Sequence, residues 1–234
     1  MRSSVYIEGP GGETVLIDAG PEFRLQAVRA GIDRLDAIFL THAHADHING
    51  LDDVRPLSRL NPLPVYGNQQ TIEEMKERFS YIWKETQLGG GKPQLNPHVV
   101  SVSPVQIGSL IFTPLPVKHG VLDILGWEVG GKAGGSFLYL TDTSAIPAAT
   151  MERLISSNSR SRVIVIGGLR ARPHETHFTF EQAIDVALGI GAKEIFLTHI
   201  CHEHSHVKIE EICQKLRKEG TEIHPAWDGL ELFL

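Results

Sequence analysis

The segment THAHADH at positions 41–47 constrains this chain more than any other feature of its sequence. It follows a short apolar run that predicts a buried strand, and the apolar residues after it recur at helical spacing. His42 and His44 are two residues apart on an extended segment, so their side chains share a face and can bind one cation. Asp46 and His47 follow and can bind a second cation beside it. A lone histidine is usually a surface or hydrogen-bonded core residue, but this cluster predicts a site for zinc, manganese or iron.

Composition narrows the class of protein. The 234 residues include 12 histidines but only 2 cysteines, Cys201 and Cys213, which excludes a disulfide framework and a cysteine-built structural zinc site. The length, with 41% hydrophobic and 21% charged residues, fits one large α/β domain.

A net charge of −6 gives no general attraction to nucleic acid. No apolar run approaches the roughly 20 residues of a membrane span, and the first residues lack the apolar stretch of a signal peptide. We therefore expect a cytoplasmic protein without membrane contact.

Strands and helices alternate along the whole sequence. Apolar runs predict strands at Ser3–Glu8, Glu13–Asp18, Ala37–Leu40, Pro64–Tyr66, Val99–Val102, Leu110–Val117, Trp127–Val129, Phe137–Leu140, Val163–Ile166, Ile195–Leu197 and Leu230–Leu234. Helices are predicted at Pro21–Ala30, Thr71–Trp83 and Ala148–Ser156, from a capping box at Thr179 and Gln182, and along the apolar stripe from Ile209 to Leu216. This order predicts an α/β architecture with two sheets packed face to face and helices outside.

Three further residues of metal-ligand type stand where predicted strands end. They are His119, Asp142 and His199. Together with the first cluster, they place ligand groups at four strand ends, where rigid elements can hold them. Asp142 could instead cap a helix before Ser144, and a single histidine of this kind would be a weak signal.

The order His42-x-His44-x-Asp46-His47, then His119, Asp142 and His199, resembles the metallo-β-lactamase-fold hydrolase superfamily over essentially the whole chain. Shorter motifs are similar to its phosphodiesterase branch, and most of all to the phosphoribosyl cyclic phosphate phosphodiesterases of the PhnP type. These motifs are Leu16–Gly20, Thr113–Val117, Leu140–Thr143 and Leu197–Ile200.

The resemblance implies a four-layer αββα sandwich with two divalent metal ions. Zinc and manganese are the metals we expect first, and iron also suits the ligands. In that scheme, one ion is held by His42, His44 and His119, the second by Asp46, His47 and His199, and both by Asp142. Asp46 would also orient the attacking hydroxide. Asp18 would orient a ligand by hydrogen bonding, although a simple turn before Gly20 is an alternative.

The loop before Thr179 carries further candidates. The resemblance implies that a histidine just before this helix works in catalysis without binding metal, and His177 matches that position better than His174. A surface histidine is the alternative. Arg170 and Arg172 could bind a phosphate, because guanidinium matches phosphate geometry, or could be solvated loop charges.

The sequence also departs from the family pattern. Many members begin with an additional strand and a cysteine cluster that binds a structural zinc. His202 occupies the position of that zinc's histidine, but the cysteines have no counterpart, so we expect a single domain over residues 1–234 that lacks this N-terminal piece. An exposed strand edge would favour a homodimer. For His204 and His206, near His202 and Cys201, a solvated loop is the preferred interpretation.

These observations favour metal-dependent hydrolysis of a small anionic phosphodiester, such as a ribose cyclic phosphate. An acyl hydrolase with the same fold, which would hydrolyse a thioester, lactone or β-lactam in place of a phosphodiester, is an alternative. A tRNA-processing nuclease is disfavoured because the sequence has no basic run that could follow a phosphate backbone. A non-catalytic accessory protein, as in pyrroloquinoline quinone biosynthesis, would be expected to lack some ligands, and here all are present.

Overall fold

The structure is a computed structural model that describes residues 1–85, 91–131, 135–156 and 163–233. The chain divides into two compact units, Met1–Leu110 and Ile111–Leu234, which we call the first and the second unit. Within the described ranges, no helix is long and apolar enough to cross a membrane. The single domain expected over residues 1–234 stays a prediction.

The first unit is built on a sheet with the strand order β1-β2-β3-β4-β5. β1 and β2, which match the first two predicted strands, form an antiparallel hairpin, while β3, β4 and β5 each run parallel to the strand before them. The carboxyl ends of β2, β3 and β4 therefore meet at one edge of this sheet. The strands are β1 (Val5–Glu8), β2 (Thr14–Ile17), β3 (Ala37–Phe39), β4 (Leu63–Gly67) and β5 (Leu95–Val99), and β6 (Val105–Ile107) follows them in the chain.

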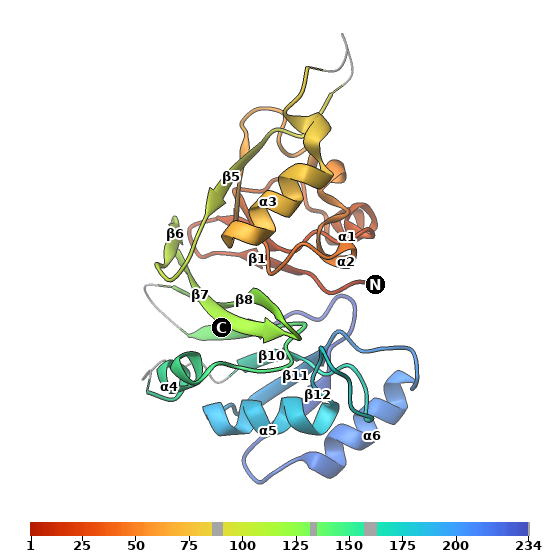
Figure 1. The fold of residues 1–234 in the computed structure, drawn as a ribbon. Helices are drawn as coiled ribbons and strands as arrows, with labels where there is room; N and C mark the ends of the chain where they lie inside the picture. Colours follow the sequence, from red (N-terminus) through yellow and green to blue (C-terminus); the bar gives the residue numbers. More distant parts are fainter. Residues whose placement is uncertain (86–90, 132–134, 157–162, 234) are drawn as a thin grey trace. The chain divides into compact units, whose positions relative to one another are not determined.

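Short helices cover this sheet, and α3 lies against β4 and β5 (Figure 1). Ile48, Leu51 and Val54 recur at helical spacing and are fully buried, which explains why the chain turns back towards the sheet after the THAHADH segment. The helices are α1 (Phe23–Ala30), α2 (Ala45–Ile48), η1 (Leu51–Val54), α3 (Gln69–Arg78) and η2 (Ser80–Ile82).

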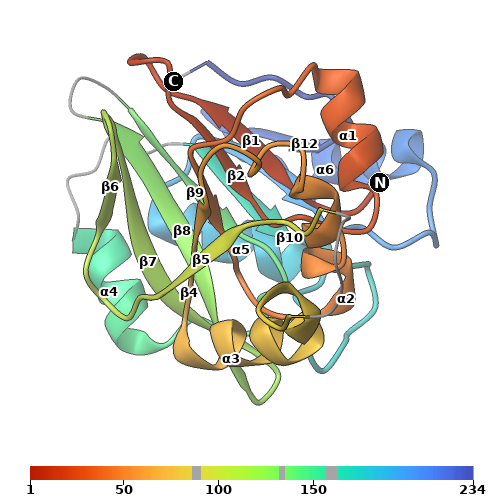
Figure 2. The same ribbon diagram turned by 90° about the horizontal axis from the view of Figure 1, so that it is seen from above.

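The second unit contains a mixed sheet with the strand order β12-β11-β10-β9-β8-β7. The four strands from β9 to β12 are parallel, so their carboxyl ends share one edge, and the long antiparallel strands β7 and β8 continue the sheet (Figure 2). The strands are β7 (Leu110–His119), β8 (Leu122–Gly131), β9 (Ser136–Leu140), β10 (Val163–Gly167), β11 (Glu194–Thr198) and β12 (Glu222–Pro225).

Three helices pack on this second sheet. α5 (Phe180–Ile190) contacts β10, β11 and α4 (Ala148–Ser156), while α6 (His206–Leu216) packs on β12. The capping box at the start of α5 is present as predicted, and Gly191 ends that helix in a left-handed conformation. The α/β class expected from the sequence is thus confirmed.

Several predicted elements were wrong in place or length. The strand expected at Trp127–Val129 is only the middle of β8, which runs from Leu122 to Gly131, and β6 was not predicted. Residues 230–233 of the expected strand Leu230–Leu234 form no strand, and residue 234 lies outside the described residues; the last strand is β12, where buried Ile223 and Pro225 alternate with polar neighbours. The strand expected at Val99–Val102 instead ends at Val99, and Pro97 is tolerated in it because β5 is an edge strand. The helix expected over Thr71–Trp83 ends at Arg78 and is followed by η2.

Candidate metal-dependent active site

The first candidate cluster lies beyond the ends of β2 and β3 in the first unit. The ring of His42 lies 4.5 Å from that of His44 and 4.3 Å from that of His47, measured between ring centroids. His44 has an extended backbone at the N-terminus of α2, and Asp46 and His47 belong to that helix. His42 and His47 are buried while His44 is exposed. The strand-to-helix turn therefore gathers the three imidazoles as the sequence predicts.

Asp18 is fully buried beside these histidines. Its Oδ2 accepts hydrogen bonds from the Thr41 hydroxyl at 2.8 Å and from His47 Nδ1 at 2.7 Å, and its Oδ1 accepts one from the Thr41 backbone N–H at 2.8 Å. Thr41 Oγ1 lies 3.0 Å from His42 Nδ1. Because the Thr41 hydroxyl donates to Asp18, it accepts from His42 Nδ1. Both histidines then carry their proton on Nδ1, which leaves Nε2 as the nitrogen that a metal ion would bind.

The second candidate cluster surrounds Asp142 in the second unit. Asp142 Oδ2 lies 3.3 Å from His199 Nε2 and 3.9 Å from His177 Nδ1. The ring of His177 stacks on that of His199 at 5.0 Å and meets that of His119 edge-on at 4.7 Å. His119 Nδ1 lies 2.7 Å from the Thr176 carbonyl oxygen, so it donates there and its Nε2 is again the nitrogen suited to a metal.

These side chains come from four different positions of the second unit. His119 ends β7, Asp142 and His199 follow β9 and β11, and His177 precedes α5. The helix-cap alternative for Asp142 is wrong, because α4 begins only at Ala148. Ligand-type atoms of His119, Asp142 and His177 all lie within 4.8 Å of one another, so His177 belongs to this cluster in space.

Backbone strain marks both clusters. Asp18, Asp142 and His199 have φ values of 60°, 51° and 54°, and they are the non-glycine residues with positive φ in the described part of the chain. Asp18 and His199 directly follow β2 and β11, and Asp142 comes two residues after the end of β9. Such a conformation costs of order 1 kcal/mol or more for a residue with a side chain, and it commonly persists where function requires it. Sequence reasoning missed this feature, since aspartate and histidine at a strand end carry no such signal by themselves.

Burial governs the charge of His177. It lowers the pKa of this histidine to about 4, against the opposing effect of the Asp142 carboxylate and with smaller help from His199 and His119. In the protein without ligands His177 is therefore neutral at pH 7, with one ring nitrogen donating and the other accepting.

Arg170 and Arg172 both contact Glu203. Their predicted role in phosphate binding stays a prediction. Among the described residues, the groups of side chains close enough to share a metal ion do not include His202, His204 or His206. His202 and His204 lie in a loop as expected, but the loop interpretation is wrong for His206, which is the first residue of α6.

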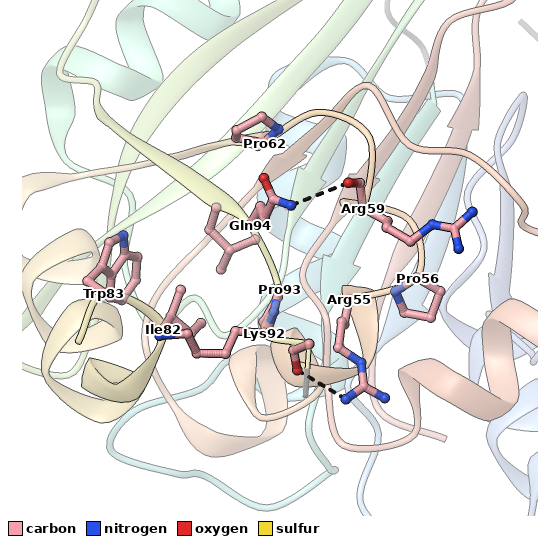
Figure 3. A pocket seen from close by; sticks show the side chains of 11 residues that line it. Arg55, Pro56, Arg59, Pro62, Ile82, Trp83, Lys92, Pro93 and Gln94 are labelled. Carbon is pink, nitrogen blue, oxygen red and sulfur yellow. Dashed lines mark hydrogen bonds between the residues drawn. The ribbon is translucent and has the colours of Figure 1, made fainter. Parts of the chain in front are cut away.

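The first unit also contains an open pocket of about 770 Å³. Figure 3 shows its polar side chains turned towards nearby backbone: Arg55 Nη1 donates to the Gly91 carbonyl at 3.2 Å, and Gln94 Nε2 donates to the Arg59 carbonyl at 3.3 Å. Lys92 Nζ likewise donates to the Tyr81 carbonyl at 3.0 Å. No predicted metal ligand is among the described residues that line this pocket, and Arg55, Lys92 and Gln94 tie neighbouring loops together through these hydrogen bonds.

Comparisons with known proteins agree with this picture. A family model described as beta-lactamase superfamily domain matches residues 13–200. A crystal structure of a diphosphatase from the PhnP family is 39% identical, covers 99% of this chain and 83% of that chain, and superposes with a TM-score of 0.84. The expected metallo-β-lactamase fold and the resemblance to the PhnP type are thereby confirmed.

Two curated relatives add detail. A ribonuclease Z from Aeropyrum pernix is 34% identical over 287 aligned residues, covering 99% of this chain and 92% of its own length. An octanoyltransferase from Porphyromonas gingivalis is 37% identical over 234 residues, covering all of this chain. The chain spans only 45% of that protein's length.

Proposed function

The chain belongs to the beta-lactamase superfamily, and on that premise we propose that it is a dinuclear metal-dependent hydrolase of a small phosphodiester, such as a ribose cyclic phosphate. The observation that carries this proposal is the cluster around Asp142, in which a buried carboxylate contacts one predicted ligand histidine and one histidine outside the predicted ligand set. The PhnP-family diphosphatase supports a phosphate-containing substrate.

The donor types fit divalent metal ions. In the arrangement that the family resemblance implies, His42, His44 and His119 would hold one ion, Asp46, His47 and His199 would hold a second, and Asp142 would be shared by both. Imidazole nitrogens and carboxylate oxygens suit zinc, manganese and iron, and the hydrogen bonds to Nδ1 of His42, His47 and His119 present the opposite nitrogen for binding. Bound ions of this kind polarise a phosphoryl oxygen and lower the pKa of a bound water.

The protein's own residues would supply orientation and proton transfer. Asp18 and Thr41 fix the rings of His47 and His42, and Asp46 orients the attacking water. His177 gives a proton to the leaving oxygen. Although burial keeps its pKa low, a phosphoryl anion bound beside the ring raises that pKa, as the Asp142 carboxylate does.

Metal analysis of the purified protein, combined with hydrolysis of bis(p-nitrophenyl) phosphate and of ribose cyclic phosphates, tests the proposal. We expect two equivalents of metal and turnover that a chelator abolishes. His177→Ala should reduce kcat about 10²- to 10⁴-fold at unchanged metal content. His202→Ala, an exposed histidine outside both clusters, is the matched control and should leave kcat unchanged. Loss of metal in His177→Ala would instead assign His177 as a ligand.

An acyl hydrolase is the second candidate, favoured by the octanoyltransferase relative. The same metal centre could attack the carbonyl carbon of a thioester, and an octanoyl thioester is the direct substrate to try. Faster turnover of that thioester than of any phosphodiester in the panel would replace the first proposal with the second.

A ribonuclease of the tRNA-processing kind is a further candidate, favoured by the Aeropyrum relative. It predicts binding of tRNA that weakens steeply with salt, because such binding depends on phosphate contacts. We expect no such binding from a chain whose net charge is −6.

A further inference from the structure

Glu203 is bound by two arginines through a single carboxylate oxygen. Its Oε1 accepts hydrogen bonds from Arg172 Nε at 3.0 Å and Arg172 Nη2 at 2.5 Å, and Arg170 Nη1 lies 3.4 Å from the same atom. Three N–H donors from two guanidinium groups thus converge on one point. One carboxylate oxygen cannot give each of these three donors a full hydrogen bond, whereas a phosphoryl group offers three oxygens and more negative charge.

Arg170 is the less satisfied of the two arginines. Its side chain is 16% exposed, and both of its Nη contacts, to Glu203 and to the Pro173 carbonyl, are long at 3.4 Å. Its buried Nε has no hydrogen-bond partner among the described residues. A largely buried guanidinium with weak contacts is costly, because the group has lost most of its water without gaining full hydrogen bonds. Arg170 therefore has capacity for a stronger anion.

The position of this pair links it to the second cluster. Arg170 forms a parallel bridge with Thr179, and its carbonyl accepts a hydrogen bond from the Phe180 N–H at 3.1 Å, which fixes it beside the start of α5. Glu203 follows His199 by four residues. The ion pair therefore joins the same two loops that bring the stacked rings of His177 and His199 together.

We propose that Arg170 and Arg172 form a subsite for a second phosphoryl group of the substrate, and that Glu203 occupies this subsite until that group displaces it. The inference rests on the proposed phosphodiesterase function and narrows its substrate to a phosphodiester or diphosphate that carries a further phosphoryl group. Glu203 then determines specificity, because it occupies the N–H groups of both arginines and only a ligand with more negative charge than a carboxylate can replace it there.

Titration calorimetry of the full-length protein with its metals tests this inference, with inorganic pyrophosphate and inorganic phosphate as the probes. Glu203→Gln keeps the shape of the side chain and removes its charge, so we expect pyrophosphate to bind about tenfold more tightly. Arg172→Gln, at an exposed side chain, should weaken the same binding about tenfold. Glu219→Gln makes the same charge change at an exposed glutamate elsewhere and should leave the affinity unchanged.

Opposite shifts in the Glu203 and Arg172 variants support the subsite. Equal weakening in both would overturn it and leave Glu203 as a residue that merely holds the arginines in place. Unchanged affinity in both would also overturn it, because the anion would then be bound by other groups, such as the metals. The titration measures binding without turnover, so its result is independent of the proposed function. If the protein binds pyrophosphate through these arginines but hydrolyses no phosphodiester, the proposed function fails and the subsite stands.

Discussion

Replacing Asp18 by asparagine removes one carboxylate oxygen while keeping the side chain's shape and a residue type that tolerates a left-handed backbone. The amide oxygen can keep the hydrogen bond from the Thr41 N–H. The amide nitrogen then faces the Thr41 hydroxyl and His47 Nδ1, where the carboxylate now accepts at 2.8 and 2.7 Å. Since an amide N–H cannot accept, His47 must move its proton to Nε2, the nitrogen needed for metal.

The magnitude follows from two hydrogen bonds to a charged group that become hydrogen bonds between neutral groups. The former contribute about 1.5–3 kcal/mol each and the latter about 0.5–1.5 kcal/mol each, so the free energy of unfolding of the metal-free protein should fall by about 2 kcal/mol. At about 2–4 °C per kcal/mol for a chain of this size, the Tm falls by about 4–8 °C. Loss of a carboxylate that orients a ligand histidine should also weaken metal binding about 10- to 100-fold.

Thermal melts of the metal-free protein and zinc titrations against a competing chelator measure both effects. Asp36→Asn is the matched control. Asp36 Oδ2 also accepts hydrogen bonds from a threonine, from the N–H of Thr14 at 2.8 Å and from its hydroxyl at 3.2 Å, and one more from Arg34 Nη2 at 2.9 Å, but Asp36 belongs to neither cluster. That control should lower the Tm less, since Asp36 is partly exposed, and should leave zinc affinity unchanged. Unchanged zinc affinity in Asp18→Asn would refute the assigned tautomer of His47.

Two further predictions concern stability. A Cβ on Gly50 would lie 2.1 Å from the Gly20 carbonyl oxygen, so Gly50→Ala should destabilise the protein by about 3 kcal/mol in urea unfolding. Gly189 lies in α5, where an added Cβ would meet no atom within 4 Å, so Gly189→Ala should stabilise the protein by up to about 1 kcal/mol. Equal effects of the two would contradict the close approach. Metal-free protein should lose stability as pH falls from about 6.5 towards 4, because His177 takes up a proton in that window only when unfolded. His177→Gln should flatten this part of the stability profile, and an unchanged profile would show that other groups cause it.

The sequence was sufficient to predict which residues would gather at each strand edge. Parallel strands must end together, so His42 after one strand and Asp142 and His199 after two others are brought to sheet edges by topology alone. Ligand chemistry then requires rare residue types at those ends, and these types are visible without any structure. This reasoning does not extend to His119, which ends the antiparallel strand β7, or to His177, which lies in the loop before α5; the family resemblance predicted their place in the site.

Features that depend on contacts between distant loops could not be predicted in this way. Thr41 gave no signal, because threonine is ordinary at a strand end and only its hydrogen bonds to Asp18 and His42 reveal its role. Glu203 and Arg172 are 31 residues apart and meet only after two loops fold. β12 escaped notice because Pro225 and polar residues interrupt its apolar pattern.

The left-handed backbones at Asp18, Asp142 and His199 bear on how such a chain can change over generations. Glycine would relieve the strain at each of these positions. At Asp18 the hydrogen bonds to Thr41 and His47 oppose this replacement, because they stabilise the fold by more than the strain costs. At Asp142 and His199, selection for the side chains that would bind metal opposes it, so a lineage released from metal chemistry would exchange these two residues for glycine before Asp18.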